Sequence, residues 1–465
     1  MMRGALSRFS APRIAIALLA AAALAIAVGR PAWLSADSVD AAALCLVTVG
    51  LWATGVIPEY LTALAFFLLA MLFHVAPASV IFSGFESAAL WLVFGGLVIG
   101  VSIRHTGLGD QLAHRLADNL HGSYGRIIGG LVLVATVLAF VMPSSMGRVV
   151  LLVPIVLSLA DRFGFEEGSN GRTGAVLAVV LGANVPAFAI LPANVPNMIL
   201  MGSAETLYNV TPAYGQYLLL HFPVLGLLRA GALAALIVTL FPDTPRERAD
   251  VHAAAPPPVN ARQRVMAALL IGALVCWGTD FVHHVSPAWI ALAVAVVCLW
   301  PGTGLLPAGA LNDRLNYGPI FFVAGIMGLG ALMAHSGLGD EIARALLRVI
   351  PLAPGHPAGD FAALVGIAMV TGLFTTAAGV PAVLTPLASE MAKASGLPLE
   401  TVLMTQVVGF STMLLPYQVA PLVVGTRLGG QSIGDAARLT LFLALAGITV
   451  LMPLDYLWWR LLGWL

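Results

Sequence analysis

Apolar segments long enough to cross a lipid bilayer follow one another along almost the entire chain. A membrane-spanning helix needs about 20 apolar residues. Apolar runs occur near residues 12–29, 38–57, 61–76, 87–103, 126–142, 148–160, 173–202, 216–240, 264–282, 286–300, 317–334, 360–374, 380–392, 400–424 and 437–459. Charged residues form only 9 % of the chain, against about 25 % in soluble domains. The sequence therefore predicts an all-α polytopic membrane protein, not a soluble enzyme, a nucleic-acid-binding protein or a disordered chain.

Several of these runs are too short to span a bilayer alone, and four of the short runs form two pairs. Each pair, 126–142 with 148–160 and 360–374 with 380–392, is interrupted by a break of about five residues. Such pairs are typical of re-entrant helical hairpins. The remaining runs predict eleven spanning helices, which places the two chain ends on opposite sides of the membrane.

The basic residues predict the orientation of these helices. With the N-terminus in the cytoplasm, 15 of the 22 basic residues fall on cytoplasmic segments and five fall outside, as the positive-inside rule requires. The remaining two, Arg148 and Arg229, lie inside apolar runs. We therefore expect a multi-pass protein of the cell (inner or plasma) membrane, with a cytoplasmic N-terminus and an external C-terminus. Residues 1–37 form the N-terminal cytoplasmic segment and a first helix that is retained.

The two halves of the chain resemble each other. HTGLGDQLAHRL from His105 reappears as HSGLGDEIARAL from His335, which is 230 positions later. PSSMG from Pro143 matches TTAAG from Thr375, and LPANVPNMILMG from Leu191 matches LPYQVAPLVVG. Each repeat holds an odd number of spans, so the second is inverted, as in many secondary transporters. The predicted parts are repeat 1 at 38–240 (hairpin 126–163, interrupted helix 173–208), a cytoplasmic linker at 241–263, and repeat 2 at 264–465 (hairpin 360–395, interrupted helix 400–428).

The helical pattern breaks at the two hairpin tips and at two proline-rich interruptions. Irregular backbone inside a membrane is tolerated only where it is packed in protein or lines a cavity, and a helix that starts after a break offers N–H groups to an anion. We expect the four breaks to meet in one site, although proline kinks are the ordinary alternative. The predicted substrate-binding residues are Ser144, Ser145, Arg148, Asn194, Asn197, Thr375, Thr376 and Gln418. The predicted ion-binding positions are Pro143, Gly147, Pro192, Gly379 and Pro416.

Arg148 directly follows the first hairpin tip. A cation at membrane depth usually marks a site or a pathway, and a guanidinium beside Ser144 and Ser145 suits a carboxylate or sulfate. Snorkelling to the interface or pairing within the hairpin is the alternative. Arg229 lies far from any break, which favours a structural role.

Acidic residues and motifs limit the other functions. We expect no carboxylate in the middle of an apolar run, with Glu59, Glu86 and Asp280 near the ends, which argues against an antiporter built on buried carboxylates. His74 and His221 are interpreted as satisfied core residues. The chain has no HExxH, GxSxG or P-loop pattern, so we expect neither an enzyme nor a bound cofactor or metal.

In these residues the chain resembles the divalent anion/sodium symporter family of the ion transporter superfamily. WLVFGGLVIG from Trp91 with the TGLGD after it, PSSMGRVVLLVP from Pro143 and PNMILMG carry the resemblance. It implies eleven spans, two re-entrant hairpins, a homodimer and an elevator-like movement. The family carries a Ser-Asn-Thr triplet at each tip, where this chain has Ser144-Ser145-Met146 and Thr376-Ala377-Ala378.

The combined prediction is a secondary active transporter of a small anion, a di- or tricarboxylate or sulfate, with alternating access. Its expected partners are the anion, the bilayer and a second copy, with no nucleic acid. Sodium and a proton both remain open as the coupling ion, and Arg148 in place of a bound cation would make transport sodium-independent. A cation/proton antiporter or arsenite-type permease of the same superfamily is the alternative. A membrane-embedded enzyme or assembly subunit is the alternative of another class.

Overall fold

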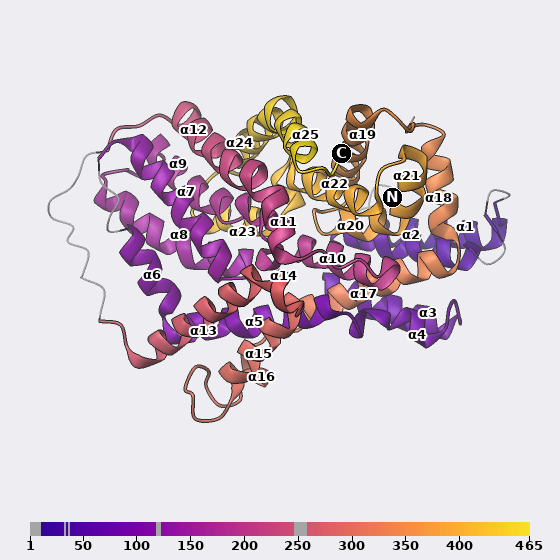
Figure 1. Cartoon of the computed structure of the whole chain (residues 1–465), viewed down its shortest axis with the longest axis horizontal. Helices are drawn as coiled ribbons and strands as arrows, with labels where there is room; N and C mark the ends of the chain where they lie inside the picture. The colour runs from indigo at the N-terminus through magenta and orange to yellow at the C-terminus, as the bar shows by residue number, and fades with distance from the viewer. Residues whose placement is uncertain (1–10, 32–33, 36–37, 118–121, 246–257, 351) are drawn as a thin grey trace, which may run out of the picture. The chain divides into compact units, whose positions relative to one another are not determined.

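The computed structural model describes residues 11–31, 34–35, 38–117, 122–245, 258–350 and 352–465, and in these residues the regular structure is helical throughout (Figure 1). The predicted all-α fold is therefore confirmed. Residues 1–10, and 246–257 in the middle of the predicted linker, lie outside the described residues.

The interrupted helices and the hairpins come in the same order in both halves of the chain, although the hairpin arm that matches α8 is divided into α20 and α21. In the first half the helices are α1 Ala11–Gly29, α2 Ser38–Thr54, α3 Glu59–Leu72, α4 Ala78–Ile81, α5 Ala88–Thr106, α6 Leu108–Ala117, α7 Tyr124–Val141, α8 Ser145–Arg162, α9 Asn170–Gly182, α10 Val195–Tyr208, α11 Tyr214–His221 and α12 Arg229–Leu240. In the second half they are α13 Ala261–Gly278, α14 Asp280–His283, α15 Pro287–Leu299, α16 Ala310–Asp313, α17 Gly318–His335, α18 Leu338–Leu347, α19 Pro357–Phe374, α20 Gly379–Leu384, α21 Ala388–Ser395, α22 Leu399–Ser411, α23 Ala420–Leu428, α24 Ile433–Ala446 and α25 Met452–Leu461.

Every predicted span and hairpin arm coincides with helix. Among the described residues, eight helices are long and apolar enough to cross a membrane: Ala88–Thr106, Tyr124–Val141, Asn170–Ala189, Tyr214–Leu240, Ala261–Gly278, Gly318–His335, Pro357–Phe374 and Ile433–Leu461. Shorter apolar helices are Ile16–Gly29, Ser38–Thr54, Glu59–Leu72 and Pro287–Leu299. The chain is therefore a multi-pass, all-helical membrane protein.

Two helices contain wider turns that the apolar pattern does not reveal. Phe222–Leu228, between α11 and α12, and Gly447–Leu451, between α24 and α25, are π-helical. A proline lies in or next to each segment, Pro223 and Pro453, which are 230 positions apart, the same offset as the repeat. Since proline has no N–H and its ring clashes with the carbonyl one turn earlier, the helix widens there.

The chain folds into two compact units that do not follow the order of the repeats. Unit 1 comprises residues 1–90, 199–211 and 317–410, and unit 2 comprises 91–198, 212–316 and 411–465. The chain thus passes between units inside both interrupted helices. Each unit consequently contains one hairpin from one repeat and the second half of the interrupted helix of the other repeat.

Within each unit the same kinds of element pack together. In unit 2, α8 contacts both α9 and α23, and a Cβ added to Gly425 of α23 would lie 2.5 Å from Val149 of α8. In unit 1, Tyr208 at the end of α10 donates to the backbone oxygens of Thr385 and Pro386 in the second hairpin, at 2.8 and 3.1 Å. This shared arrangement supports the internal repeat that the sequence predicts.

Glycines let the central helix of each unit approach a neighbour closely. A Cβ added to Gly95 of α5 would lie 2.9 Å from the Cβ of Ala291 in unit 2. A Cβ added to Gly325 of α17 would lie 2.6 Å from the Cβ of Ala63 in unit 1. Gly95 and Gly325 are again 230 positions apart. Small residues at such crossings are how membrane helices pack backbone against backbone.

We expect Gly325→Val to lower the stability of the protein by about 1–3 kcal/mol, because the new side chain would force α17 away from α3. Gly366→Val is the matched control, since a Cβ there meets nothing within 4 Å and the helix-propensity change is the same. Thermal unfolding in detergent compares the two variants. An equal loss in both would mean that the close approach of α17 and α3 contributes nothing.

Candidate functional site

The first hairpin tip lies in unit 2 and is held by its own hydroxyl. Ser144 precedes α8, and its Oγ accepts a hydrogen bond from the backbone N–H of Gly147 at 3.1 Å. This is a standard helix N-cap. The cap satisfies one of the N–H groups at the start of α8 and fixes where the second arm of the hairpin begins.

Arg148 is fully buried and directs its guanidinium at three backbone carbonyls. Nε and Nη2 donate to the oxygen of Ala183, at 3.1 and 2.7 Å, and both Nη atoms lie 3.2 Å from the oxygen of Ala193. Nη1 also donates to Met142 and Nη2 to Oγ of Ser145. These carbonyls belong to the residues that end α7, α9 and the turn Leu191–Ala193.

The chemical consequence is that Arg148 serves as a fixed cation. Carbonyls at helix ends have no partner within their helix and carry the negative end of the dipole. Here a guanidinium supplies the hydrogen bonds and the positive charge together. Its N–H groups are directed to these carbonyls and to Ser145, so an electrostatic role for Arg148 fits this geometry better than a direct bond to substrate.

The first interruption meets the first tip through this contact. Two short turns, Pro186–Ala189 and Leu191–Ala193, separate α9 from α10. Pro192 lies within the second turn, and Oγ of Ser145 reaches the oxygen of Ala193 at 3.5 Å. Two of the four predicted breaks are therefore brought together.

The side chains of Asn194 and Asn197 form hydrogen bonds with the backbone of the first interruption. Nδ2 of Asn194 donates to the oxygen of Ala187 at 2.8 Å, and Oδ1 of Asn194 accepts from the N–H of Asn197 at 3.0 Å. Nδ2 of Asn197 lies 3.1 Å from the oxygen of Phe188 and 3.0 Å from that of Ile190. Both amides thus satisfy backbone groups that the break leaves without helical partners.

In the second interruption, also in unit 2, a side-chain amide again hydrogen-bonds the backbone of the break. Pro416 begins a short turn, Pro416–Gln418, between α22 and α23. Oε1 of Gln418 accepts hydrogen bonds from the N–H groups of Leu414 and Leu415, at 2.8 and 2.9 Å. Gln418 is buried, and its amide holds the loop in place.

The second hairpin tip lies in unit 1 and repeats the hydroxyl-to-glycine hydrogen bond of the first. Oγ1 of Thr376 accepts from the N–H of Gly379 at 3.3 Å, as Ser144 does for Gly147. Oγ1 of Thr375 donates to the oxygen of Thr371 at 2.9 Å. The position that matches Arg148 is Val380, so the two tips differ in charge.

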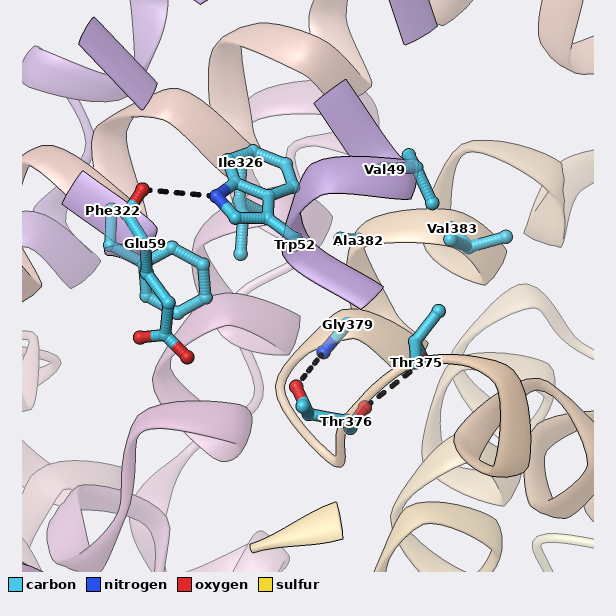
Figure 2. Close-up of a pocket in the computed structure, with 10 residues that line it drawn as sticks. All are labelled: Val49, Trp52, Glu59, Phe322, Ile326, Thr375, Thr376, Gly379, Ala382 and Val383. Carbon is cyan, nitrogen blue, oxygen red and sulfur yellow. Dashed lines mark hydrogen bonds between the residues drawn. The ribbon is translucent and has the colours of Figure 1, made fainter. Parts of the chain in front are cut away.

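A small pocket adjoins this second tip. Figure 2 shows the loop of Thr375, Thr376 and Gly379 on one side and Trp52, Phe322 and Glu59 on the other. Nε1 of Trp52 donates to the backbone oxygen of Glu59 at 3.0 Å. Among the described residues that line the pocket, Glu59 is the one ionisable side chain.

The predicted site residues thus divide between the units. Unit 2 holds most of them: Ser144, Ser145, Arg148, Asn194, Asn197 and Gln418, with Pro143, Gly147, Pro192 and Pro416. Unit 1 holds Thr375, Thr376 and Gly379. The first tip and the first interruption are in direct contact. The roles of the predicted residues in substrate and ion binding remain predictions.

A fully buried carboxylate lies at a place that the apolar pattern does not single out. Asp455 in α25 comes four residues before the end of the predicted run 437–459, so a carboxylate near the end of a run can still be fully buried. Arg229 of the same unit is also buried, and its Nη1 donates to Oγ of Ser411 at 2.9 Å. Within the described residues neither carboxylate oxygen of Asp455 has a hydrogen-bond partner.

The interpretation of two histidines is corrected. His74 is exposed just after α3, with a positive φ of 54°, rather than a core residue. His221 is fully buried between the rings of Tyr217 and Trp459, but within the described chain neither ring nitrogen has a hydrogen-bond partner.

Known proteins are similar to this chain in sequence and in fold. A family model described as "Citrate transporter" matches residues 49–409. An L-tartrate/succinate antiporter of Escherichia coli is 23 % identical over 403 residues, covering 81 % of this chain and 79 % of its own. A "Membrane protein" of Cupriavidus necator is 24 % identical over 395 residues, covering 82 % and 76 %. The crystal structure of the Alcanivorax borkumensis YdaH transporter, described as having an unusual topology, matches with a TM-score of 0.55 at 16 % identity, covering 92 % of this chain and 99 % of that one.

Proposed function

Because the chain belongs to the citrate transporter family of the ion transporter superfamily, we propose that it exchanges small di- or tricarboxylates across the membrane without sodium. A multi-pass secondary transporter of carboxylate type is established by the family and its relatives. Exchange, sodium independence and the choice of substrate belong to the proposal. The proposed exchange needs no bound cofactor. If transport is not a pure exchange, we propose the proton as the coupling ion.

The carbonyl contacts of Arg148 are the observation that carries the proposal. Carbonyl oxygens that converge on one point are hard ligands and suit a metal cation such as sodium. In this chain the oxygens of Ala183, Ala193 and Met142 receive a guanidinium instead. A cation that cannot dissociate gives the anion its counter-charge without a sodium gradient.

Placement of the substrate follows from the charges of the two tips. The first tip combines Arg148 with the N-terminus of α8, both favourable to a carboxylate. The pocket of the second tip contains Glu59, which repels an anion. We place the carboxylate beside Ser144 and Ser145, with Asn194, Asn197 and Gln418 shaping the surrounding loops.

Three further features belong to the proposal. The resemblance to the divalent anion/sodium symporters implies a homodimer and an elevator-like movement with alternating access. The distribution of basic residues supports a cytoplasmic N-terminus and an external C-terminus. The exchange of half-helices between the two units supports an inverted repeat, the architecture of many secondary transporters.

We expect purified protein in liposomes loaded with succinate to take up labelled L-tartrate, citrate or succinate at the same rate with sodium or with choline outside. A fixed cation makes the sodium concentration irrelevant to binding. Empty liposomes control for leak, and sulfate tests whether a non-carboxylate dianion is accepted. Strict dependence on sodium would contradict the sodium-free proposal, and the lack of uptake of every carboxylate would contradict the substrate class.

A cation/proton antiporter is the second candidate, because such a mechanism needs a buried carboxylate, and Asp280, Asp360 and Asp455 are buried. Arg229 is a buried cation of the same unit as Asp455 and donates to Ser411, which favours a structural role for both of these charges. A pH-sensitive dye inside the same liposomes separates the two functions. Proton release driven by an alkali-cation gradient, without any carboxylate, would support the antiporter.

A further inference from the structure

A basic pocket opens in unit 2, apart from the residues that the sequence predicts for the site. It is lined by Val101, Arg104 and His105 in the last two turns of α5, and by Pro307 and Arg314 in the segment between α15 and α17. Three of these five lining residues are basic, and none of the five is acidic. We call this cavity the basic pocket.

The basic side chains that line the basic pocket have no ion-pair partner among the residues that the structure describes. Within the part of the chain that the structure describes, the side chains of Arg104, His105 and Arg314 make no hydrogen bond or ion pair. Guanidinium groups near one another repel unless an anion lies between them. The pocket therefore carries a positive potential that a bound anion would neutralise.

The basic pocket adjoins the first hairpin tip through Arg104. A Cβ added to Gly147 would lie 3.2 Å from Nη1 of Arg104, so this guanidinium rests on the first turn of α8. The N-terminus of α8 is itself the positive end of a helix dipole. Arg148 follows Gly147 in the same turn, with its N–H groups directed to carbonyls. An anion in the basic pocket would relieve the repulsion among these positive groups and would lie beside the tip.

We propose that the basic pocket is a second anion-binding site, which holds a small dicarboxylate dianion before the dianion reaches the first hairpin tip. The inference rests on the proposed carboxylate transport. Arg104 and Arg314 each offer the planar pair of N–H donors that binds a carboxylate in two-point fashion. Both arginines belong to segments predicted to be cytoplasmic, so the basic pocket receives substrate from the cytoplasm.

The test compares Arg104→Gln, Arg314→Gln and the double variant in right-side-out and inside-out vesicles. For L-tartrate presented from the cytoplasmic face, we expect the double variant to raise KM about tenfold with kcat retained, because capture loses about 1.4 kcal/mol. The change should shrink at high salt, since screening weakens exposed charges. Arg438→Gln is the matched control, because Arg438 is an exposed arginine of unit 2 that is also predicted to be cytoplasmic.

The outcomes separate the basic pocket from general surface charge and from misfolding. An unchanged KM in the double variant, or an equal rise in Arg438→Gln, overturns the proposal. Arg104→Lys with Arg314→Lys keeps the charge and should recover part of the affinity, which a misfolded protein would not do. If wild-type protein transports no carboxylate, the proposed function fails. In that case calorimetry with sulfate still tests the basic pocket. We expect wild-type protein to bind sulfate and the double variant to lose this binding. Sulfate binding that is retained in the double variant overturns the proposal of a second anion site.

Discussion

Arg148→Ala is expected to reduce sodium-free uptake of L-tartrate by at least about 100-fold. The substitution leaves the oxygens of Ala183, Ala193 and Met142 without their shared donor. A hydrogen bond to a charged group contributes about 1.5–3 kcal/mol, and an unsatisfied backbone group inside a membrane costs several kcal/mol. A loss of about 3 kcal/mol at the substrate's counter-charge corresponds to roughly two orders of magnitude in rate.

Two further variants show whether charge or geometry matters. Arg148→Lys keeps the charge but places its donors on one nitrogen, which cannot span three carbonyls as a guanidinium does, so we expect intermediate uptake. Arg438→Ala removes an exposed arginine of the same unit and should leave uptake unchanged. Size-exclusion profiles in detergent show that each protein is folded. Full uptake by the folded Arg148→Ala variant would contradict the proposal that Arg148 serves as a fixed cation.

Sodium itself provides a rescue experiment. With the guanidinium removed, the freed oxygens of Ala183, Ala193 and Met142 face a space that a hard cation can enter. We expect added sodium to restore part of the uptake of Arg148→Ala, while wild-type uptake stays insensitive to sodium. Equal responses to sodium in both proteins would mean that Arg148 does not stand in for the ion.

The elements of this fold are predictable because their signals are local. Apolar runs predict the helices, and prolines such as Pro192 and Pro416 predict where helices break. Ser144 directly precedes α8 and caps it, a position that serine favours. The 230-residue offset also predicts which elements are equivalent.

The partners of buried polar groups are not predictable in this way, because they come from distant parts of the chain. Nothing local connects Arg148 to the carbonyl of Ala183, 35 positions away. The same holds for Arg104, which reads as an ordinary cytoplasmic arginine until the fold brings it against α8. A break predicts that polar groups must be satisfied, whereas the tertiary fold decides which side chains satisfy them.

Asp455→Leu is expected to destabilise the protein by about 3–5 kcal/mol, because it leaves the buried guanidinium of Arg229, in the same unit, as an uncompensated charge. The double variant Arg229→Met with Asp455→Leu should recover most of that loss, since apolar side chains of similar volume can replace buried opposite charges. Thermal unfolding in detergent measures both variants and the Arg229→Met single variant. The double variant also removes the bond from Arg229 to Ser411, so any stability it fails to recover includes that hydrogen bond.

This double substitution also shows whether the two buried charges serve stability or transport. If they serve stability alone, the double variant should be stable and should exchange L-tartrate at nearly the wild-type rate. If the double variant is stable but inactive, the charges of Arg229 and Asp455 take part in transport, which would favour proton coupling over a pure exchange. If the double variant is as unstable as Asp455→Leu alone, the two charges are not energetically coupled. Arg229 would then depend on Ser411 rather than on Asp455.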